Sequence, residues 1–245
     1  MSIIKSLSVG NGDMFYIRHG SDNFTIIDCS MAEADRSRIV AELERESSDK
    51  GITRFISTHP DNDHILGLEY LDNEMNILNF YCVKNQTTKS VSTADFSRYC
   101  QLRDSEAKAF YLYAGCSRKW MNRSENGERG SSGIDIYWPD ISNEHFITAL
   151  MLARLGLSPN NISPIIKYSL NGGASLLWMG DLETDFMENI ESSLDIPPID
   201  ILFAPHHGRD TGRVPRSLLD RISPKLIVIG EAPSKHSRLR SIFSP

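Results

Sequence analysis

One short segment concentrates side chains that can bind a metal ion. The apolar run 55–58 ends, and two imidazoles and two carboxylates follow within six residues: His59, Asp61, Asp63 and His64. In an extended or turning chain, alternation puts His59, Asp61 and Asp63 on one side, and His64 opens the next turn. Zn²⁺ accepts nitrogen and oxygen ligands of this kind, and mixed sets also suit Mn²⁺ or Fe²⁺. The segment predicts a metal site; the alternative is a polar surface loop with turn hydrogen bonds.

The elements that must position this segment follow an α/β pattern. Short β-rich runs separated by turns dominate the first thirty residues, and apolar side chains then recur at helical spacing. The segment 122–133 has the composition of an exposed loop. Together the patterns predict strands at 3–9, 14–19, 23–28, 55–58, 75–83, 134–138, 163–170, 174–179, 199–203 and 226–229, and helices at 32–48, 65–71, 93–113, 143–155 and 216–222. Periodicity alone favours an α/β or α+β fold.

Five segments, in order, resemble the metallo-β-lactamase-fold hydrolases. The signature His59-x-Asp61-x-Asp63-His64 has Asp61 where the usual form has His, and this variant looks most like the hydrolase domain of ComEC-type DNA-uptake proteins and their free-standing relatives. The other four segments resemble the opening strand and turn, the strand ending in Asp28, the strand delivering Asp181 and the late His motif; they are 9–15, 25–29, 176–182 and 204–208. The resemblance spans roughly residues 3 to 232.

The resemblance implies a four-layer αββα sandwich with the metal ligands on loops at one rim of two packed sheets. Length and composition agree with a single domain, residues 1–245, and 72–142 is expected to be a family-specific insertion within it. The chain ends in a basic, Ser-rich tail where the resembled chains often continue with another strand. A truncated chain or a missing edge strand of the sheet is therefore left open. The basic residues of the tail are Lys235, His236, Arg238 and Arg240.

The resemblance also implies two divalent ions, zinc or manganese. Their expected ligands are His59 and Asp61 for one ion, Asp63 and His64 for the other, and Asp181 as the bridge. Gly180 allows a close backbone approach before Asp181. His206 or His207 would complete the second ion. The sequence leaves that choice open, because adjacent imidazoles point in different directions and one can bind substrate instead.

One departure from the family pattern leaves the first ion with fewer expected ligands. Many members supply a further His between the first motif and the bridging Asp, whereas the intervening His here is His145, in a predicted helix. The corresponding region, 158–163, resembles the Asn-Asn-x-Ser segment of ComEC-like domains. Asn161 and Ser163 are therefore candidates to orient substrate or water, although a turn needs no such role. The first ion is expected to bind weakly, to be Mn²⁺ or to arrive with substrate.

Composition and charge limit the class of protein and the partners to be expected. A hydrophobic fraction of 40% and a charged fraction of 24% are ordinary for a globular protein. A net charge of −6 argues against a protein that coats nucleic acid, but a nuclease needs only a local positive field, which bound ions supply. No apolar run approaches the roughly 20 residues of a membrane span and no secretion signal is recognisable, so we expect a cytoplasmic protein without a membrane partner. The widely spaced cysteines, expected to be reduced, are Cys29, Cys82, Cys100 and Cys116.

These features predict a metal-dependent hydrolase. Bound ions lower the pKa of a water molecule and stabilise the charge that grows on the attacked centre. Asp61 or Asp63 would orient or deprotonate that water, which makes them the catalytic candidates. The ComEC-like motifs favour a phosphodiester in nucleic acid or a small nucleotide, and Arg209 and Arg213, beside the late His motif, are candidates to bind it. A protein partner and the oligomeric state stay open.

Three other functions stay open beside this one. A fold of this kind hosts many chemistries, so the substrate could be a non-phosphate ester, a thioester or an amide. A degenerate member would bind a nucleic acid or partner without catalysis, although a scaffold needs no such set of costly polar groups. A di-iron redox protein is the third, and Asp61 in place of His argues against it.

Overall fold

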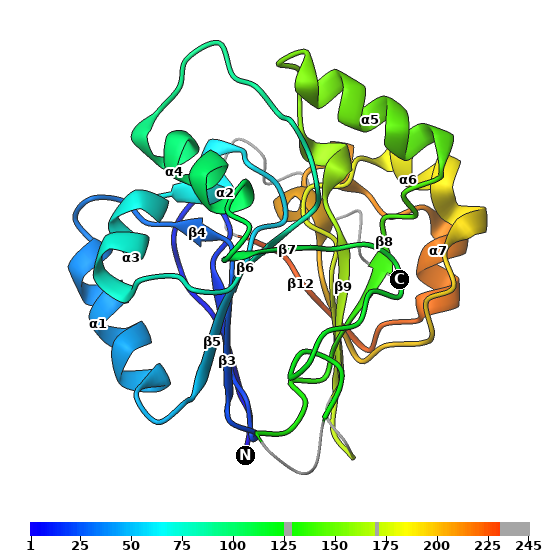
Figure 1. Cartoon of the computed structure of the whole chain (residues 1–245). Helices are drawn as coiled ribbons and strands as arrows, with labels where there is room; N and C mark the ends of the chain where they lie inside the picture. Colours follow the sequence, from blue (N-terminus) through cyan, green and yellow to red (C-terminus); the bar gives the residue numbers. More distant parts are fainter. Residues whose placement is uncertain (125–128, 170–171, 231–245) are drawn as a thin grey trace.

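The first of two β-sheets comes from the first half of the chain (Figure 1). The computed structural model describes residues 1–124, 129–169 and 172–230. The sheet holds six strands in the order β1 (Ile3–Ser6), β2 (Phe15–Arg18), β3 (Asn23–Ile27), β5 (Ile52–Ile56), β6 (Phe80–Cys82) and β7 (Ala109–Tyr111). From β3 to β7 the neighbours run parallel. The helices on its outer face are α1 (Arg36–Ser47), α3 (Leu68–Met75) and α4 (Ala94–Arg103).

The second sheet comes from the second half. Its order is β12 (Leu226–Val228), β11 (Ile201–Phe203), β10 (Ser175–Trp178), β9 (Ile165–Ser169) and β8 (Ile134–Trp138). β10, β11 and β12 run parallel. The outer helices are α5 (Glu144–Arg154), α6 (Thr184–Ile190) and α7 (Arg216–Ile222), and the short elements are β4 (Cys29–Ser30), α2 (Asn62–Ile65) and the 3-10 turns η1 (Asn160–Ile162), η2 (Glu191–Ser193), η3 (Pro205–Gly208) and η4 (Asp210–Gly212). The predicted αββα sandwich is confirmed (Figure 1).

Alternation along the strands builds two apolar layers. On β2, Phe15 and Ile17 belong to the core shared with the second sheet, whereas Tyr16 packs in the core under the outer helices. The ring centroid of Phe15 lies 4.8 Å from that of Phe203 on β11. Packing across the two inner faces therefore fixes the sheets relative to each other, and with them the loops at the strand ends.

Several predicted elements differ from the observed ones: the strand predicted at 3–9 ends at Ser6, and three further elements are divided or shortened. The helix predicted at 65–71 is split at Gly67 (φ +86°), since Leu66 pairs with Ser30 of β4 before α3 begins. The helix predicted at 93–113 ends at Arg103, and its last residues form β7 beside β6. The strand predicted at 75–83 is reduced to β6, because its first residue closes α3.

Several other expectations concern the chain as a whole. The stretch 72–142 supplies β6, β7 and β8 and thus strands to both sheets, and its status as an insertion stays a prediction. Over the described residues, no helix combines the length and apolarity needed to cross a bilayer. All four cysteines are free. Residues 125–128 of the predicted loop, Leu170 and the basic tail after Gly230 lie outside the described residues.

Candidate metal centre

Loops from both sheets converge at one rim of the sandwich. Asp28 follows β3, and the motif 59–64 follows β5; because these strands run parallel, both loops lie at the same edge of the first sheet. In the second sheet, Asp181 follows β10, and the late His motif follows β11, which is again parallel. The strand order thus brings together the segments that the sequence pattern singled out.

Buried polar atoms without hydrogen-bond partners face one another where these loops meet. They are Nε2 of His59, His64 and His207 and Oδ1 of Asp181. Nε2 of His64 lies 3.1 Å from Asp181 Oδ1, and Nε2 of His207 lies 3.6 Å from Asp181 Oδ2. Leaving such atoms buried and unpaired is costly, and a cation between them removes the cost. With Asp63 Oδ2 3.4 Å from His207 Nε2, the nitrogen and oxygen atoms fit a divalent ion such as Zn²⁺ or Mn²⁺.

Two carboxylates lie beside the second ring nitrogen, Nδ1, of two of these imidazoles. Nδ1 of His64 lies 2.8 Å from Oδ2 of Asp28; this oxygen also accepts from the hydroxyl of Thr58, and Asp28 Oδ1 accepts from the backbone N–H of Thr58. Nδ1 of His207 lies 3.3 Å from Oδ1 of Asp13. A carboxylate behind a histidine fixes the ring and makes its other nitrogen a better metal ligand.

Asp13 is a site residue that the sequence reasoning missed. The segment around it resembled a family strand and turn, but no role followed for its carboxylate. In the structure, Asp13 N–H donates to Asp63 O at 3.2 Å, and Asp13 belongs with His64, Asp181 and His207 to a group whose ligand atoms all lie within 4.8 Å of one another. Gly12 permits this approach, because a Cβ there would lie 2.5 Å from Asp63 O. The Gly-Asn-Gly-Asp turn at 10–13 was the sequence feature that could have indicated a role for Asp13.

The late His motif has an uncommon backbone. His206 and His207 both adopt left-handed conformations (φ 52° and 56°), which non-glycine residues rarely do outside sites that need them. The turn is held by a hydrogen bond from His206 N–H to Gly180 O at 3.0 Å. It directs His207 toward Asp63 and Asp181. His206 lies at the rim, where its Nε2 is 3.6 Å from Asp181 Oδ2 and 3.1 Å from Arg209 Nη1.

The charges in the cluster are strongly coupled. Burial disfavours charge on His207, but Asp13 and Asp63 outweigh it and raise the pKa of this imidazole to about 9. Burial likewise opposes the charge of His64, whereas Asp181 and Asp28 raise its pKa. Burial and then the neighbouring His64 hold the pKa of His59 well below its usual value. Because ligating imidazoles must be neutral, binding of an ion releases protons from this cluster.

Asp61 lies at the outer side of the centre. Its side chain is one-third exposed, and its Oδ2 lies 3.9 Å from Nε2 of His59. Lys89 Nζ donates to its Oδ1 at 3.1 Å. His145, the other His considered as a ligand, lies on α5 with a partly exposed side chain beside Glu144 and is not part of the cluster.

The residues predicted to bind substrate occupy different places. Ser163 Oγ lies 3.3 Å from Nδ1 of His59 and accepts a hydrogen bond from Asp181 N–H, while Asn161 exchanges hydrogen bonds with Glu183. These contacts support the ligand loops, and a contact of either residue with substrate stays a prediction. Arg209 reaches the rim, where its Nη2 donates to Asn11 Oδ1 at 2.9 Å. Arg213 is exposed at the end of η4.

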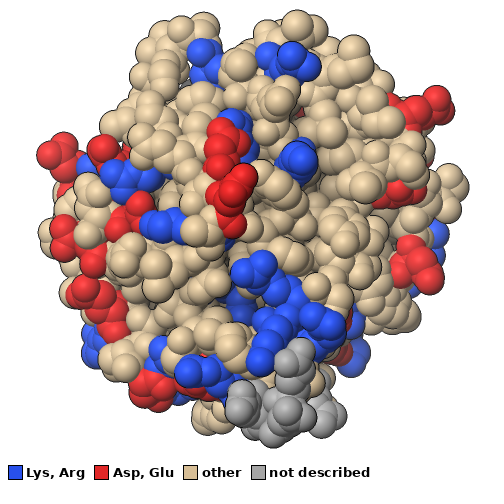
Figure 2. All heavy atoms as spheres, in the orientation of Figure 1, with Lys and Arg blue, Asp and Glu red and all other residues tan. Residues whose placement is uncertain are grey.

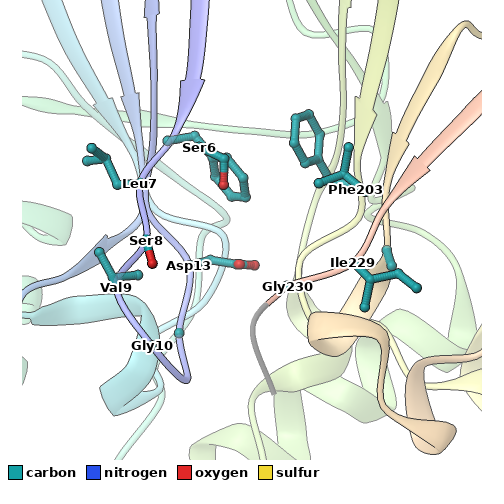
Figure 3. Close-up of a pocket in the computed structure, with 13 residues that line it drawn as sticks. Ser6, Leu7, Ser8, Val9, Gly10, Asp13, Phe203, Ile229 and Gly230 are labelled. Atoms are coloured by element: carbon teal, nitrogen blue, oxygen red, sulfur yellow. The ribbon is translucent and has the colours of Figure 1, made fainter. Parts of the chain in front are cut away.

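A cavity of about 210 Å³ adjoins the cluster between the edge strands of the two sheets (Figure 3). Ser6, Leu7 and Asp13 line it from the first sheet, and Phe203 and Ile229 line it from the second. The Asp13 carboxylate points into the gap between the sheets (Figure 3), so the cavity reaches the residue that backs His207.

Comparison with known proteins bears on the first part of the chain. Residues 7–95 match the family model of the metallo-β-lactamase superfamily, and they include the second strand, Asp28 and the motif 59–64. Comparison with curated proteins found no match. Among solved structures, the chain is similar to BLEG-1, a B3 metallo-β-lactamase (14% identity, 73% of this chain and 72% of that one, TM-score 0.40). A putative metallo-β-lactamase from Thermotoga maritima is also similar (14% identity, 82% and 94%, TM-score 0.44), and neither similarity indicates a substrate.

Proposed function

We propose that this chain is a metal-dependent hydrolase of phosphodiesters, acting on nucleic acid or a small nucleotide. The observation that carries the proposal is the cluster of buried His64, His207 and Asp181 with the partly exposed Asp63. Two cationic side chains, Lys89 and Arg209, lie beside it. The match of residues 7–95 to a superfamily of mostly hydrolytic, metal-dependent proteins supports the reaction class. The ComEC-like order of His59, Asp61, Asp63 and His64 favours the phosphodiester.

An ion held by these residues would lower the pKa of a water molecule and would stabilise the negative charge that grows on the attacked phosphodiester. The chain's own residues do the positioning. His64 and His207 are aimed by Asp28 and Asp13, and Asp181 lies between the loops of the two sheets. Asp61, which is partly exposed 3.9 Å from His59, is the proposed residue to orient the water and to take its proton.

Arginine at the rim fits an anionic substrate. The guanidinium of Arg209 lies 3.1 Å from His206 and 4.0 Å from Asp63, so its remaining N–H groups lie beside the centre. Guanidinium forks match phosphate oxygens in geometry and charge. Arg213 lies farther out on the same segment and would bind a phosphate only of a longer substrate.

Basic side chains also gather elsewhere on the molecule. Figure 2 shows Lys and Arg collected at the lower centre of one face, over the segment between β7 and β8. Arg129 of this segment pairs with Asp22, just before β3 begins, whereas the metal centre lies where β3 ends. This basic surface is therefore at the other end of the strands, and the proposal does not depend on it.

The test is a hydrolysis screen of the purified chain with Mn²⁺, Zn²⁺ and Mg²⁺. The substrates are single- and double-stranded DNA, RNA, cyclic nucleotides and a chromogenic phosphodiester, with a carboxyl ester and a thioester as comparisons. We expect metal-dependent cleavage of at least one phosphodiester, abolished by chelator. If only the carboxyl ester or the thioester is cleaved, the proposed phosphodiester substrate is wrong. If an oligonucleotide binds but nothing is cleaved, the chain is a binding protein without catalysis.

Separate Arg209→Gln and Arg213→Gln variants test for a polymeric substrate. If both arginines contact phosphates, each variant weakens oligonucleotide binding more than hydrolysis of the chromogenic phosphodiester, and flattens the salt dependence of binding. Equal losses on both substrates, with an unchanged salt slope, would indicate a small phosphodiester instead.

A further inference from the structure

The candidate ligands around Asp181 form two groups, which differ in whether a cationic side chain already contacts them. On one side, His64 and His207 face Asp181 and Asp63 through Nε2 atoms that make no hydrogen bond. Beside Asp61, His59 lies 3.9 Å from both Asp61 Oδ2 and Asp181 Oδ2, and its Nε2 likewise makes no hydrogen bond; the difference lies in the groups around it. This is the side that the sequence predicts to lack a histidine.

Lys89 contacts the carboxylate on this second side. Its ammonium donates to Asp61 Oδ1 at 3.1 Å, and its side chain is largely covered, with 18% exposed. The ammonium also lies 5.5 Å from the centroid of the Phe96 ring. The preceding residue fixes the loop, because Thr88 N–H donates to Ala153 O and its hydroxyl to Arg154 O. Lys89 is therefore held at Asp61 by the fold.

Arg209 contacts the remaining imidazole on the same side. Its Nη1 lies 3.1 Å from Nε2 of His206, and a guanidinium can only donate, so this nitrogen accepts the hydrogen bond. Nδ1 of His206 then carries the proton and donates to Thr211 Oγ1, 2.9 Å away. The lone pair that would bind an ion is used by Arg209.

We propose that the centre binds one divalent ion tightly, between His64 and His207, and that Lys89 and Arg209 supply the positive charge at the position beside His59. The inference rests on the proposed function only for its assignment of the ion-binding cluster. It replaces the pair of ions expected from the family resemblance by one ion and two cationic side chains.

Electrostatics gives the physical reason. An ion beside His59 would have to displace the ammonium from Asp61 and the guanidinium from His206, or lie next to both, and like charges at such distances repel strongly in a partly buried site. Fixed cations, by contrast, can each bind an oxygen of an anionic substrate. The arrangement favours substrates that bring negative charge to the rim, which agrees with a phosphodiester.

Metal titration without any turnover tests the inference. Protein freed of metal by chelator is titrated with Mn²⁺, and the free ion is counted by its electron paramagnetic resonance signal. We expect one tight equivalent and a second at least about 10-fold weaker. Lys89→Met should tighten the second equivalent by about 10-fold, and Arg209→Met should act in the same direction. Lys89→Arg, which keeps the charge, should behave as the parent.

Lys84→Met is the matched control, because Lys84 lies on the same loop with its ammonium over the Tyr111 ring, away from Asp61. It should leave both equivalents unchanged. Two equivalents of equal affinity in the parent protein, or no tight equivalent at all, would overturn the inference. So would a second equivalent that neither Lys89→Met nor the alternative Lys89→Gln tightens. A protein with the expected titration but no hydrolytic activity would overturn the proposed function and leave this inference standing.

Discussion

Asp28 and His64 are joined by a 2.8 Å contact between a buried carboxylate and Nδ1 of a buried imidazole, and this contact decides which nitrogen faces the metal centre. Asp28 is itself held by two hydrogen bonds from Thr58 at 2.6 and 2.7 Å. A residue that binds no ion directly thus orients one that does.

Asp28→Asn should therefore weaken metal binding by roughly 10- to 100-fold, the range seen when such supporting partners are removed. The reason is that an amide in this place no longer fixes the tautomer of His64. Competition with a chromophoric chelator measures the affinity. Asp49→Asn, at an exposed carboxylate paired with Arg18, is the control and should change nothing. Equal affinity in Asp28→Asn and the parent would remove His64 from the ligand set.

Asp181→Ala should abolish hydrolysis and lower the metal content while the fold persists, because the change deletes a charged group between the loops rather than an apolar core side chain. Circular dichroism checks the fold, and elemental analysis checks the metal. Asp185→Ala, on the exposed side of α6, should retain both activity and metal. Unchanged turnover and metal content in Asp181→Ala would contradict the assignment.

The two late histidines should separate in their effects. His207→Ala should lower metal affinity by about 10-fold or more, since it removes a nitrogen facing Asp63 and Asp181. His206→Ala should mainly change turnover, because its Nε2 accepts from Arg209. Metal titration and steady-state kinetics on both variants give the comparison. Negligible effects of both changes would place the late His motif outside the active centre.

Acid stability should depend on His19, far from the metal centre. Burial, followed by the nearby charges of Arg54 and Lys50, lowers the pKa of this imidazole to about 3. The unfolded chain, with a pKa near 6.5, takes up the proton first as the pH falls, so stability is complete above about 6.5 and is lost progressively toward 3. Between pH 7.5 and pH 5, His19 should contribute a loss of about 2 kcal/mol, which the difference between the parent and His19→Gln isolates.

Urea unfolding at the two pH values measures this loss. His19→Gln should lose correspondingly less stability on acidification than the parent does. His145→Gln, at a partly exposed imidazole on α5, should follow the parent. An identical pH dependence in His19→Gln would mean that His19 does not titrate in this range.

Much of the centre could be predicted from sequence because its parts stand next to strand ends. His59 and His64 follow β5, which ends at Ile56, and Asp181 follows β10, which ends at Trp178, so an apolar run followed by ligands indicates both. Asp13 and Lys89 could not be assigned in this way. Their places depend on a loop that Gly12 lets approach Asp63 and on a loop tied to the end of α5, and neither contact leaves a periodic pattern.

The same reason explains the errors in the fold. Residues 93–113 have a continuous helical pattern, but pairing with β6 turns the last part into an edge strand. Local preference is weaker than the hydrogen bonds and packing that a sheet edge offers. At Gly67 a single residue decides instead. Its left-handed backbone interrupts the predicted helix, although the spacing of apolar residues continues through it.

The chain builds its two sheets one after the other, with every named strand of the first before residue 112 and every named strand of the second after residue 133. Asp63 and His64 come from the first part, and Asp181 and His207 from the second. A cut between β7 and β8 would therefore yield two fragments that meet through one apolar interface and share one ion. An ion bound by ligands from both fragments would strengthen their association. A chelator would therefore raise the dissociation constant of the fragment pair, and added metal would lower it again.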